Sequence, residues 1–219
     1  MTPDDLESLP PEAELAIAYS PEKVAGRLRT FLALDRRLGR IVSATTEPML
    51  GQMRLAWWRD MLGKPVEERP SGDAVLDAIG ELWQGQENAL QKVVDAWEIL
   101  VIADHLGENE LRQYAADRGH PFGVFLESAD RRDEGRTATS AQRWALADTV
   151  ARISEESERS AIIAAARDLN DFGGRHPREL RGLAVLDALA RRALERGGKP
   201  LMDGRGAALV ALRAGIIGR

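Results

Sequence analysis

The stretch VAGRLRTFLALDRRLGRIV, from Val24 to Val42, contains the clearest helix signal in the chain. Its apolar residues recur every three or four positions, which places their side chains on one face of an α-helix. A single long amphipathic helix is therefore predicted here, and its apolar face needs a partner surface. The apolar positions are Val24, Leu28, Phe31, Leu34, Leu38, Ile41 and Val42.

The same pattern continues on both sides of the chain's glycine and proline breaks. β-Branched residues never alternate over a strand-length run, and aromatic residues make up only 5% of the sequence. We predict an all-α fold, with one helical bundle over residues 1–219 that packs around a common core. Two polar stretches, Gly63–Gly72 and Ala129–Ser140, are predicted to be loops. Further apolar stripes lie at 50–61, 76–83, 90–101, 146–153, 162–169 and 180–194.

Composition excludes several classes of function. The chain has 219 residues and no cysteine, so it has no disulfide, zinc-thiolate site or thiol nucleophile. Its net charge of −5 argues against nucleic-acid binding, which needs a basic footprint. No apolar stretch approaches the roughly 18 residues of a membrane span, and the acidic segment Met1–Pro11 does not resemble a signal peptide. We predict a cytoplasmic protein.

The carboxyl-terminal segment leaves peripheral membrane contact open. Arg205, Arg213 and Arg219 alternate there with apolar residues, as in a short helix that lies on an anionic membrane. The alternative, which we favour, is that this segment packs back onto the bundle, since three arginines are few for electrostatic anchoring.

The segment AYSPEKVAGRLRTFLALDRRLGRIVSATTEPMLGQMRLAWWRDML, Ala18 to Leu62, resembles the squalene/phytoene synthase family. The likeness is most specific over Glu47–Leu62, and looser pieces at 95–98, 110–119 and 183–200 extend it over most of the chain. The resemblance implies an isoprenoid-synthase type of helical bundle with a central cavity. In the family's enzymes, two aspartate-rich motifs on facing helices hold Mg²⁺, which binds the diphosphates of two isoprenyl substrates.

The sequence departs from that pattern at the carboxylates. Where the first motif is expected, LDRRLGR at 34–40 has one acid and three arginines, and Gly39 stands four residues after Asp35. The nearest match to the second motif, ADTVARISEE at 147–156, ends in glutamates without the aspartate spacing. Ile99 stands near the place of a further family aspartate. We therefore predict no metal site, and expect Asp35 to pair with an arginine beside it.

Other acids and histidines offer no substitute. Asp73 and Asp77 have helical spacing, but an acid such as Asp73 in the opening turn of a helix is explained by the helix dipole. Asp168 and Asp171 are predicted to lie on the surface at a helix end. No histidine has a second ligand at metal-binding spacing; the three are His105, His120 and His176.

Four residues are candidates for binding a substrate or lipid. Arg54 and Trp57 belong to the segment RLAWWRD, where Trp57 would line a lipid cavity and Arg54 would face an anionic head group. The alternative, which we favour, is that Trp57 and Trp58 both pack in the core and Arg54 pairs with a buried acid. The resemblance places Tyr114 at a tyrosine of the family and Arg152 at an arginine of the family. For Tyr114 the alternative is ordinary packing with a hydrogen-bonded hydroxyl.

Three functions remain open at this point. The leading hypothesis is a squalene/phytoene synthase-like protein with a degenerate active site, which is non-catalytic and binds a protein partner in assembly or an isoprenoid lipid. The second is an active Mg²⁺-dependent prenyl transferase, for which Mg²⁺ would be the cofactor. The third is a helical protein–protein interaction module with a filled core and no small-molecule ligand. The size of the interior cavity distinguishes them.

Overall fold

The computed structural model describes residues 8–45, 47–103, 105–127 and 130–218. This part of the chain is all helical and contains no strand, so the predicted fold class is confirmed. The α-helices are α1 (Pro11–Tyr19), α2 (Glu22–Ala44), α3 (Pro48–Gly63), α4 (Ala74–Leu82), α5 (Glu87–Ile102), α6 (Glu108–Gly119), α7 (Arg131–Val150), α8 (Glu156–Arg167), α9 (Arg181–Glu195) and α10 (Ala207–Ile217), and the 3₁₀ helices are η2 (Val66–Glu68), η3 (His120–Phe125) and η4 (Arg178–Leu180).

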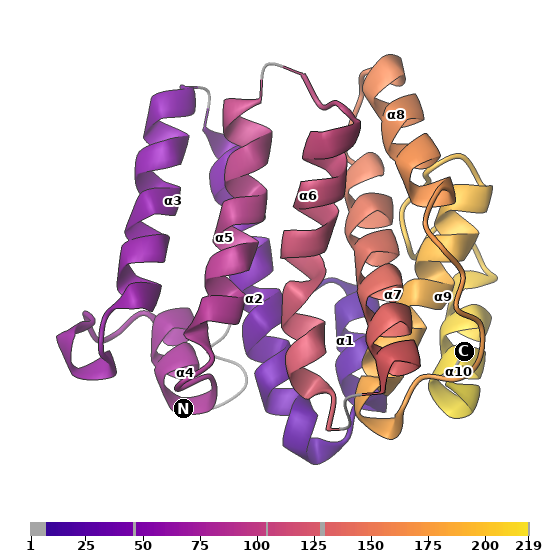
Figure 1. The fold of residues 1–219 in the computed structure, drawn as a ribbon, viewed down its shortest axis with the longest axis horizontal. Helices are drawn as coiled ribbons and strands as arrows, with labels where there is room; N and C mark the ends of the chain where they lie inside the picture. The colour runs from indigo at the N-terminus through magenta and orange to yellow at the C-terminus, as the bar shows by residue number, and fades with distance from the viewer. Residues whose placement is uncertain (1–7, 46, 104, 128–129, 219) are drawn as a thin grey trace.

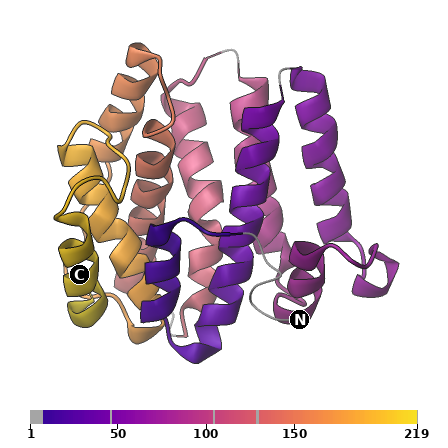
Figure 2. The same cartoon turned by 180° about the vertical axis from the view of Figure 1, so that it is seen from behind.

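The helices form a bundle two layers deep. In the front of Figure 1, α3, α5, α6 and α7 stand side by side, and each packs on the next. Helices α1 and α2 lie behind them, as the reverse view in Figure 2 shows. Helix α9 packs on both α1 and α7, and α10 packs on the outer side of α9. As a result α3 and α10 lie at opposite ends of the long axis of the molecule (Figures 1 and 2).

The long helix predicted at 24–42 is confirmed as α2. Phe31, Leu34 and Leu38 on this helix are fully buried, and they belong to one cluster of buried apolar side chains that includes residues from α1 to α10. Phe31 also meets the rings of Phe122 and Trp144 edge to face. Each such aromatic pair is worth about 0.5–1.5 kcal/mol beyond burial.

The prediction of a loop at Ala129–Ser140 is wrong. Ala129 lies outside the described residues, and α7 runs without interruption through most of the rest of that stretch. Asp130 caps this helix by accepting a hydrogen bond from the backbone N–H of Arg132 at 2.9 Å, and Asp133 and Glu134 occupy its first turn. The polar composition therefore reflects a helix start, where acids are favoured by the dipole.

Two local predictions are confirmed. The stretch Gly63–Gly72 leaves α3 and contains only the short helix η2 before α4. Asp73 is the N-cap of α4 and accepts hydrogen bonds from the backbone N–H groups of Val75 and Leu76, both at 3.0 Å.

None of the described helices combines the length and the apolar character that crossing a bilayer requires.

Candidate functional site

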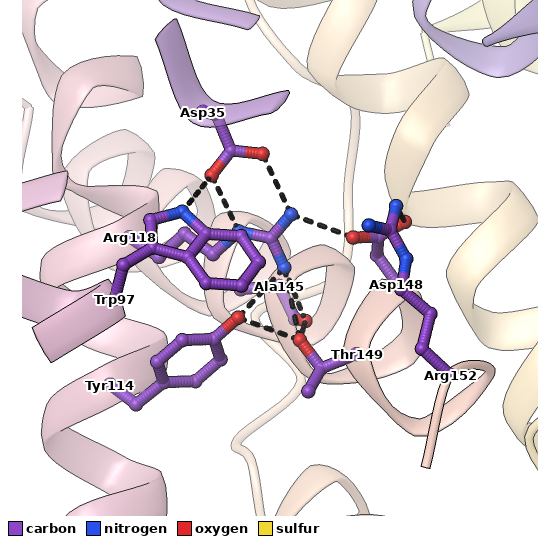
Figure 3. Close-up of polar contacts among 8 residues, drawn as sticks. All are labelled: Asp35, Trp97, Tyr114, Arg118, Ala145, Asp148, Thr149 and Arg152. Carbon is purple, nitrogen blue, oxygen red and sulfur yellow. Dashed lines mark hydrogen bonds and ion pairs between the residues drawn. The ribbon is translucent and has the colours of Figure 1, made fainter. Parts of the chain in front are cut away.

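The most unusual feature of the interior is a charged side chain at its centre. Arg118, near the end of α6, is only 1% exposed. Its Nε donates to Asp35 Oδ1 at 2.8 Å and its Nη2 to Asp35 Oδ2 at 2.7 Å. The same Nη2 donates to Asp148 Oδ2 at 2.6 Å. Because Asp35 comes from α2 and Asp148 from α7, one guanidinium joins three helices (Figure 3).

The third nitrogen of Arg118 completes the network. Its Nη1 donates to the hydroxyl of Tyr114 at 3.0 Å, to Thr149 Oγ1 at 3.0 Å and to the backbone oxygen of Ala145 at 3.1 Å. The two hydroxyls of Tyr114 and Thr149 lie 2.7 Å apart and share a hydrogen bond (Figure 3). Every nitrogen of the guanidinium thus has a partner, as a buried charge requires.

Two tryptophans stabilise the same charge. The guanidinium carbon of Arg118 lies 4.8 Å from the ring centre of Trp97 and 4.7 Å from that of Trp144. These distances are typical of cation–π contacts, which are strongest when the cation is desolvated. Trp97 also donates its indole N–H to Asp35 Oδ1 at 2.8 Å, so it contacts both the carboxylate of Asp35 and the guanidinium of Arg118.

Burial and charge act in opposite directions on the pKa values of this cluster. Burial alone would lower the pKa of Arg118, but Asp35, Tyr114 and Asp148 outweigh it and raise that pKa well above its usual value. Burial would raise the pKa of Asp148, but Arg118 and Arg152 hold it below its usual range. Burial raises the pKa of Tyr114 to about 12, so its hydroxyl stays protonated at neutral pH.

The cluster does not fit a magnesium ion. Asp35 and Asp148 face each other from the two regions where the resemblance places the aspartate motifs, but Arg118 lies between them. All four carboxylate oxygens already accept hydrogen bonds, from Trp97, Arg118 and Arg152. Mg²⁺ needs oxygen ligands in a near-octahedral arrangement. Among the described residues, no group of three or more acids and histidines is placed to hold a metal ion.

The central cavity implied by the resemblance is nearly filled. A space of about 30 Å³ adjoins Arg118, and Glu12 of α1 covers it together with Arg36 and Arg152. That volume is close to the space of one water molecule. Burial raises the pKa of Glu12, with a smaller contribution from the charge of Asp148. A larger hollow of about 620 Å³ lies beside η3 and α7, and Arg118 is not among the residues that line it.

No protein-family model, curated protein or solved structure matches this chain. The resemblance to the squalene/phytoene synthase family therefore stays a prediction.

The structure brings two of the four predicted site residues together. Tyr114 is fully buried and bonds to Thr149 and Arg118, as described for the alternative of ordinary packing with a satisfied hydroxyl. Arg152 is half exposed and donates to Asp148 Oδ1 at 3.0 Å. Both belong to the Arg118 cluster. Tyr114 lies on its buried side and Arg152 on its solvent-facing side.

The other two predicted residues lie elsewhere, on α3. Trp58 is buried, but Trp57 is 41% exposed, so the interpretation that both tryptophans pack in the core is wrong. Arg54 is exposed and donates to Thr45 Oγ1 at 3.4 Å, and it is not paired with a buried acid in the described part of the chain either. Adjacent helical residues point about 100° apart, which is why only one of the two rings enters the core.

Sequence reasoning missed the centre of the cluster. Asp35 was expected to pair with a neighbouring arginine, but it accepts hydrogen bonds from Trp97 of α5 and Arg118 of α6. A signal for Arg118 was present, because it follows Tyr114 by four residues and Leu111 by seven and therefore shares their buried face. Asp148 gives a similar signal as a lone acid in the apolar run LADTV.

A second buried polar cluster joins α7 and α9. Arg143 pairs with Asp187, which also accepts from Arg191 at 2.9 Å. His176 Nε2 lies 3.1 Å from Ser140 Oγ, while its buried Nδ1 has no hydrogen-bond partner among the described residues. Burial lowers the pKa of His176 to about 4, so this histidine is a weak base. Because Ser140 is also buried, the pair has neither the exposure nor the basicity of a nucleophilic site.

Proposed function

We propose that this chain is a non-catalytic helical bundle that binds another protein, in the manner of an assembly factor or scaffold. The observation that carries the proposal is the position of Arg118 between Asp35 and Asp148. Prenyl transfer requires dications to neutralise the departing diphosphate. Here an arginine of the chain itself supplies the positive charge between the facing acids, so the transferase alternative has no support from the geometry.

The small size of the space beside Arg118 favours protein binding over lipid binding at this place in the bundle. Small-molecule sites usually occupy about 300–1,000 Å³ and enclose most of the ligand. The space beside Arg118 measures about 30 Å³, far less than an isoprenoid chain would occupy. The proposal therefore combines the non-catalytic role of the leading hypothesis with the filled core of the third.

The outer face of α3 is the surface best suited to a protein partner. Met49, Met53 and Trp57 follow one another at four-residue spacing, and Met53 is 64% exposed. This α3 face also includes Leu50, with Ile102 from α5 exposed nearby. Methionine adapts its shape to a partner, and tryptophan is the residue most enriched among binding hot spots. Charges of both signs border the face, including Arg54 and Asp60, which suits a mixed protein surface.

Calorimetry tests the non-catalytic part of the proposal. The full chain would be titrated with MgCl₂, and then with a prenyl diphosphate analogue in the presence of MgCl₂. We expect no saturable heat in either titration, because the carboxylate oxygens of Asp35 and Asp148 are already occupied. Saturable binding of the analogue that depends on magnesium would contradict the proposal.

Affinity purification from the chain's own host tests the partner. Tagged wild type, the α3 variant Met53→Glu/Trp57→Glu and the α10 variant Ile216→Glu would be compared in membrane-free extract by mass spectrometry. We expect a partner that the wild type and the α10 variant retain and the α3 variant loses. All three substitutions are at exposed apolar positions, so the α10 variant is a matched control. Equal recovery of the same proteins by all three would count against the α3 face.

A further inference from the structure

Helix α10 is apolar on its outer side as well as its inner side. Arg213 is the one charged residue in its sequence, AALVALRAGII. Its buried alanines Ala207, Ala211 and Ala214 lie on the side where the helix packs against α9 and α1. The outer ridge is formed by Leu209, Leu212 and Ile216, of which Leu209 is 68% and Ile216 is 67% exposed. A helix on a protein surface normally presents polar residues to solvent, but this ridge presents apolar ones.

Arginines surround the α10 ridge without neutralising partners. Arg205 and Arg213 are exposed and form no ion pair with a described residue. Arg192, at the start of the helix, donates to the backbone oxygen of Asp203 at 2.7 Å. Arg181, at its end, donates to the backbone oxygen of Ile216 at 2.8 Å. Both bonds are to carbonyl groups, and neither arginine forms an ion pair with a described residue.

The charge of this region is opposite to that of the whole chain. Residues 175–219 contain ten lysines and arginines against four aspartates and glutamates, a net charge of +6, whereas the chain carries −5. Helix α10 itself contains no acid. The ridge therefore combines three exposed apolar side chains with a positive border.

The carboxyl-terminal segment packs back onto the bundle as predicted, but its outer ridge stays exposed, and Arg181 and Arg192 add to the charge of Arg205 and Arg213. We propose that the α10 ridge binds the surface of a membrane that contains anionic phospholipids. Leu209, Leu212 and Ile216 would enter the boundary between head groups and acyl chains, and the surrounding arginines would lie at the level of the phosphates. The position of α10 allows this contact, because it lies at one end of the long axis of the molecule (Figure 1) and its ridge residues are exposed. The α3 face, at the other end, has a mixed border and lacks this positive complementarity.

Vesicle flotation tests the proposal directly. The full chain would be mixed with phosphatidylcholine vesicles, with or without phosphatidylglycerol, at about 0.05 M and about 0.5 M NaCl. We expect flotation with the anionic vesicles at low salt, and a marked decrease at high salt, where the screening length falls to a few ångström. Failure of the wild type to float with anionic vesicles at low salt would overturn the proposal.

Variants separate the two contributions. Arg205→Gln/Arg213→Gln is expected to lower the partition coefficient about thirtyfold, since each basic residue near such a surface contributes about a factor of five. Leu209→Gln/Ile216→Gln is expected to lower it at least about tenfold by removing apolar contact. The matched control is Met53→Gln/Trp57→Gln on the α3 face, which should float like the wild type. An equal loss in this control would overturn the assignment to α10.

A second copy of the chain is the rival occupant of the ridge. Native mass spectrometry of the wild type and of Leu209→Gln/Ile216→Gln tests for this second copy. A monomer in both proteins supports the membrane contact. A wild-type dimer that is absent in the variant overturns the membrane proposal. The membrane result is also independent of the partner result, because flotation uses purified protein and lipid alone. Equal recovery of the same proteins by the wild type and the α3 variant, together with intact flotation, would therefore count against the α3 face only.

Discussion

Arg118 and Asp35 are joined by a bidentate hydrogen bond, with Nε–Oδ1 at 2.8 Å and Nη2–Oδ2 at 2.7 Å, although 83 positions separate them in the sequence. Both side chains are almost completely buried. A pair of this kind costs a great deal to desolvate, and it is retained only because each charge satisfies the other. Removing one partner therefore measures the cost of leaving the other charge buried without compensation.

Replacing Arg118 by methionine should destabilise the protein strongly. Arg118→Met keeps most of the side-chain volume but leaves Asp35 and Asp148 buried without their cation, which typically costs about 3–5 kcal/mol. Urea unfolding followed by circular dichroism measures the change. The control is Arg152→Met, which removes a half-exposed partner of the same Asp148 and should cost about 1 kcal/mol or less. Similar losses of unfolding free energy for the two variants would show that burial of Arg118 does not make its ion pairs more important than that of Arg152.

The same variant should reverse the pH dependence of stability. In the wild type the pKa of Asp148 is lowered, so its contribution is present above the unfolded-state pKa and is lost as the pH falls through the folded-state value. Without Arg118, burial of the carboxylate favours its protonated form, and the folded state gains stability as the pH falls from 7 toward 5. Urea midpoints across this range, with Arg118→Met/Asp148→Asn as a second variant, measure the slope. A slope unaffected by neutralising Asp148 would contradict this account.

His176 should make the wild type less stable in mild acid. Burial lowers its pKa from 6.5 to about 4, so the unfolded chain takes up a proton at pH values where the folded chain does not. Stability should therefore fall as the pH decreases from 6.5 toward 4, by up to roughly 3 kcal/mol at the lower end. Comparing the urea midpoint of His176→Phe with that of the wild type over this range tests the effect, which the variant should largely remove. The exposed His120 provides the matched control, in the variant His120→Phe.

Gly119 is predicted to be required for the approach of α6 to α7. A Cβ atom at this position would lie 2.7 Å from the Cβ of Ala141 and 3.0 Å from its backbone carbon, so the helices would have to separate. Overpacking of this kind typically costs about 1–3 kcal/mol, and Gly119→Ala should lower the melting temperature accordingly. Gly123→Ala is the matched control, because nothing lies within 4 Å of a Cβ placed there. Calorimetry that found Gly119→Ala no less stable than Gly123→Ala would refute the prediction.

The helical fold was predictable because the signal for a helix is local. The stripe at 24–42 repeats within a few residues, and burial of Phe31, Leu34 and Leu38 follows directly from it. The stretch 129–140 misled because it has no apolar stripe. Thr137 and Ser140 are nevertheless buried there, since hydrogen bonds to the backbone of Asp133 and to His176 replace apolar contacts.

The candidate site was only partly predictable because its contacts are not local. The departure from the aspartate pattern around Asp35 could be read from neighbouring residues. The arginine that pairs with it could not, because Arg118 reaches it only after α2 and α6 have packed. Likewise, the prediction that Trp57 and Trp58 both pack in the core was wrong for Trp57, because the side of α3 that is covered depends on how the helices pack and not on the local sequence.

The ionic centre has a consequence for how the bundle comes apart. Asp35, Arg118 and Asp148 come from α2, α6 and α7, and exposing any one of them would separate it from a buried partner of opposite charge. Local opening of α2, α6 or α7 alone would leave a buried charge without its partner. Such partly unfolded states should therefore be poorly populated. Denaturation should thus be all-or-none across the central helices, and fragments ending before residue 118 should fail to fold independently.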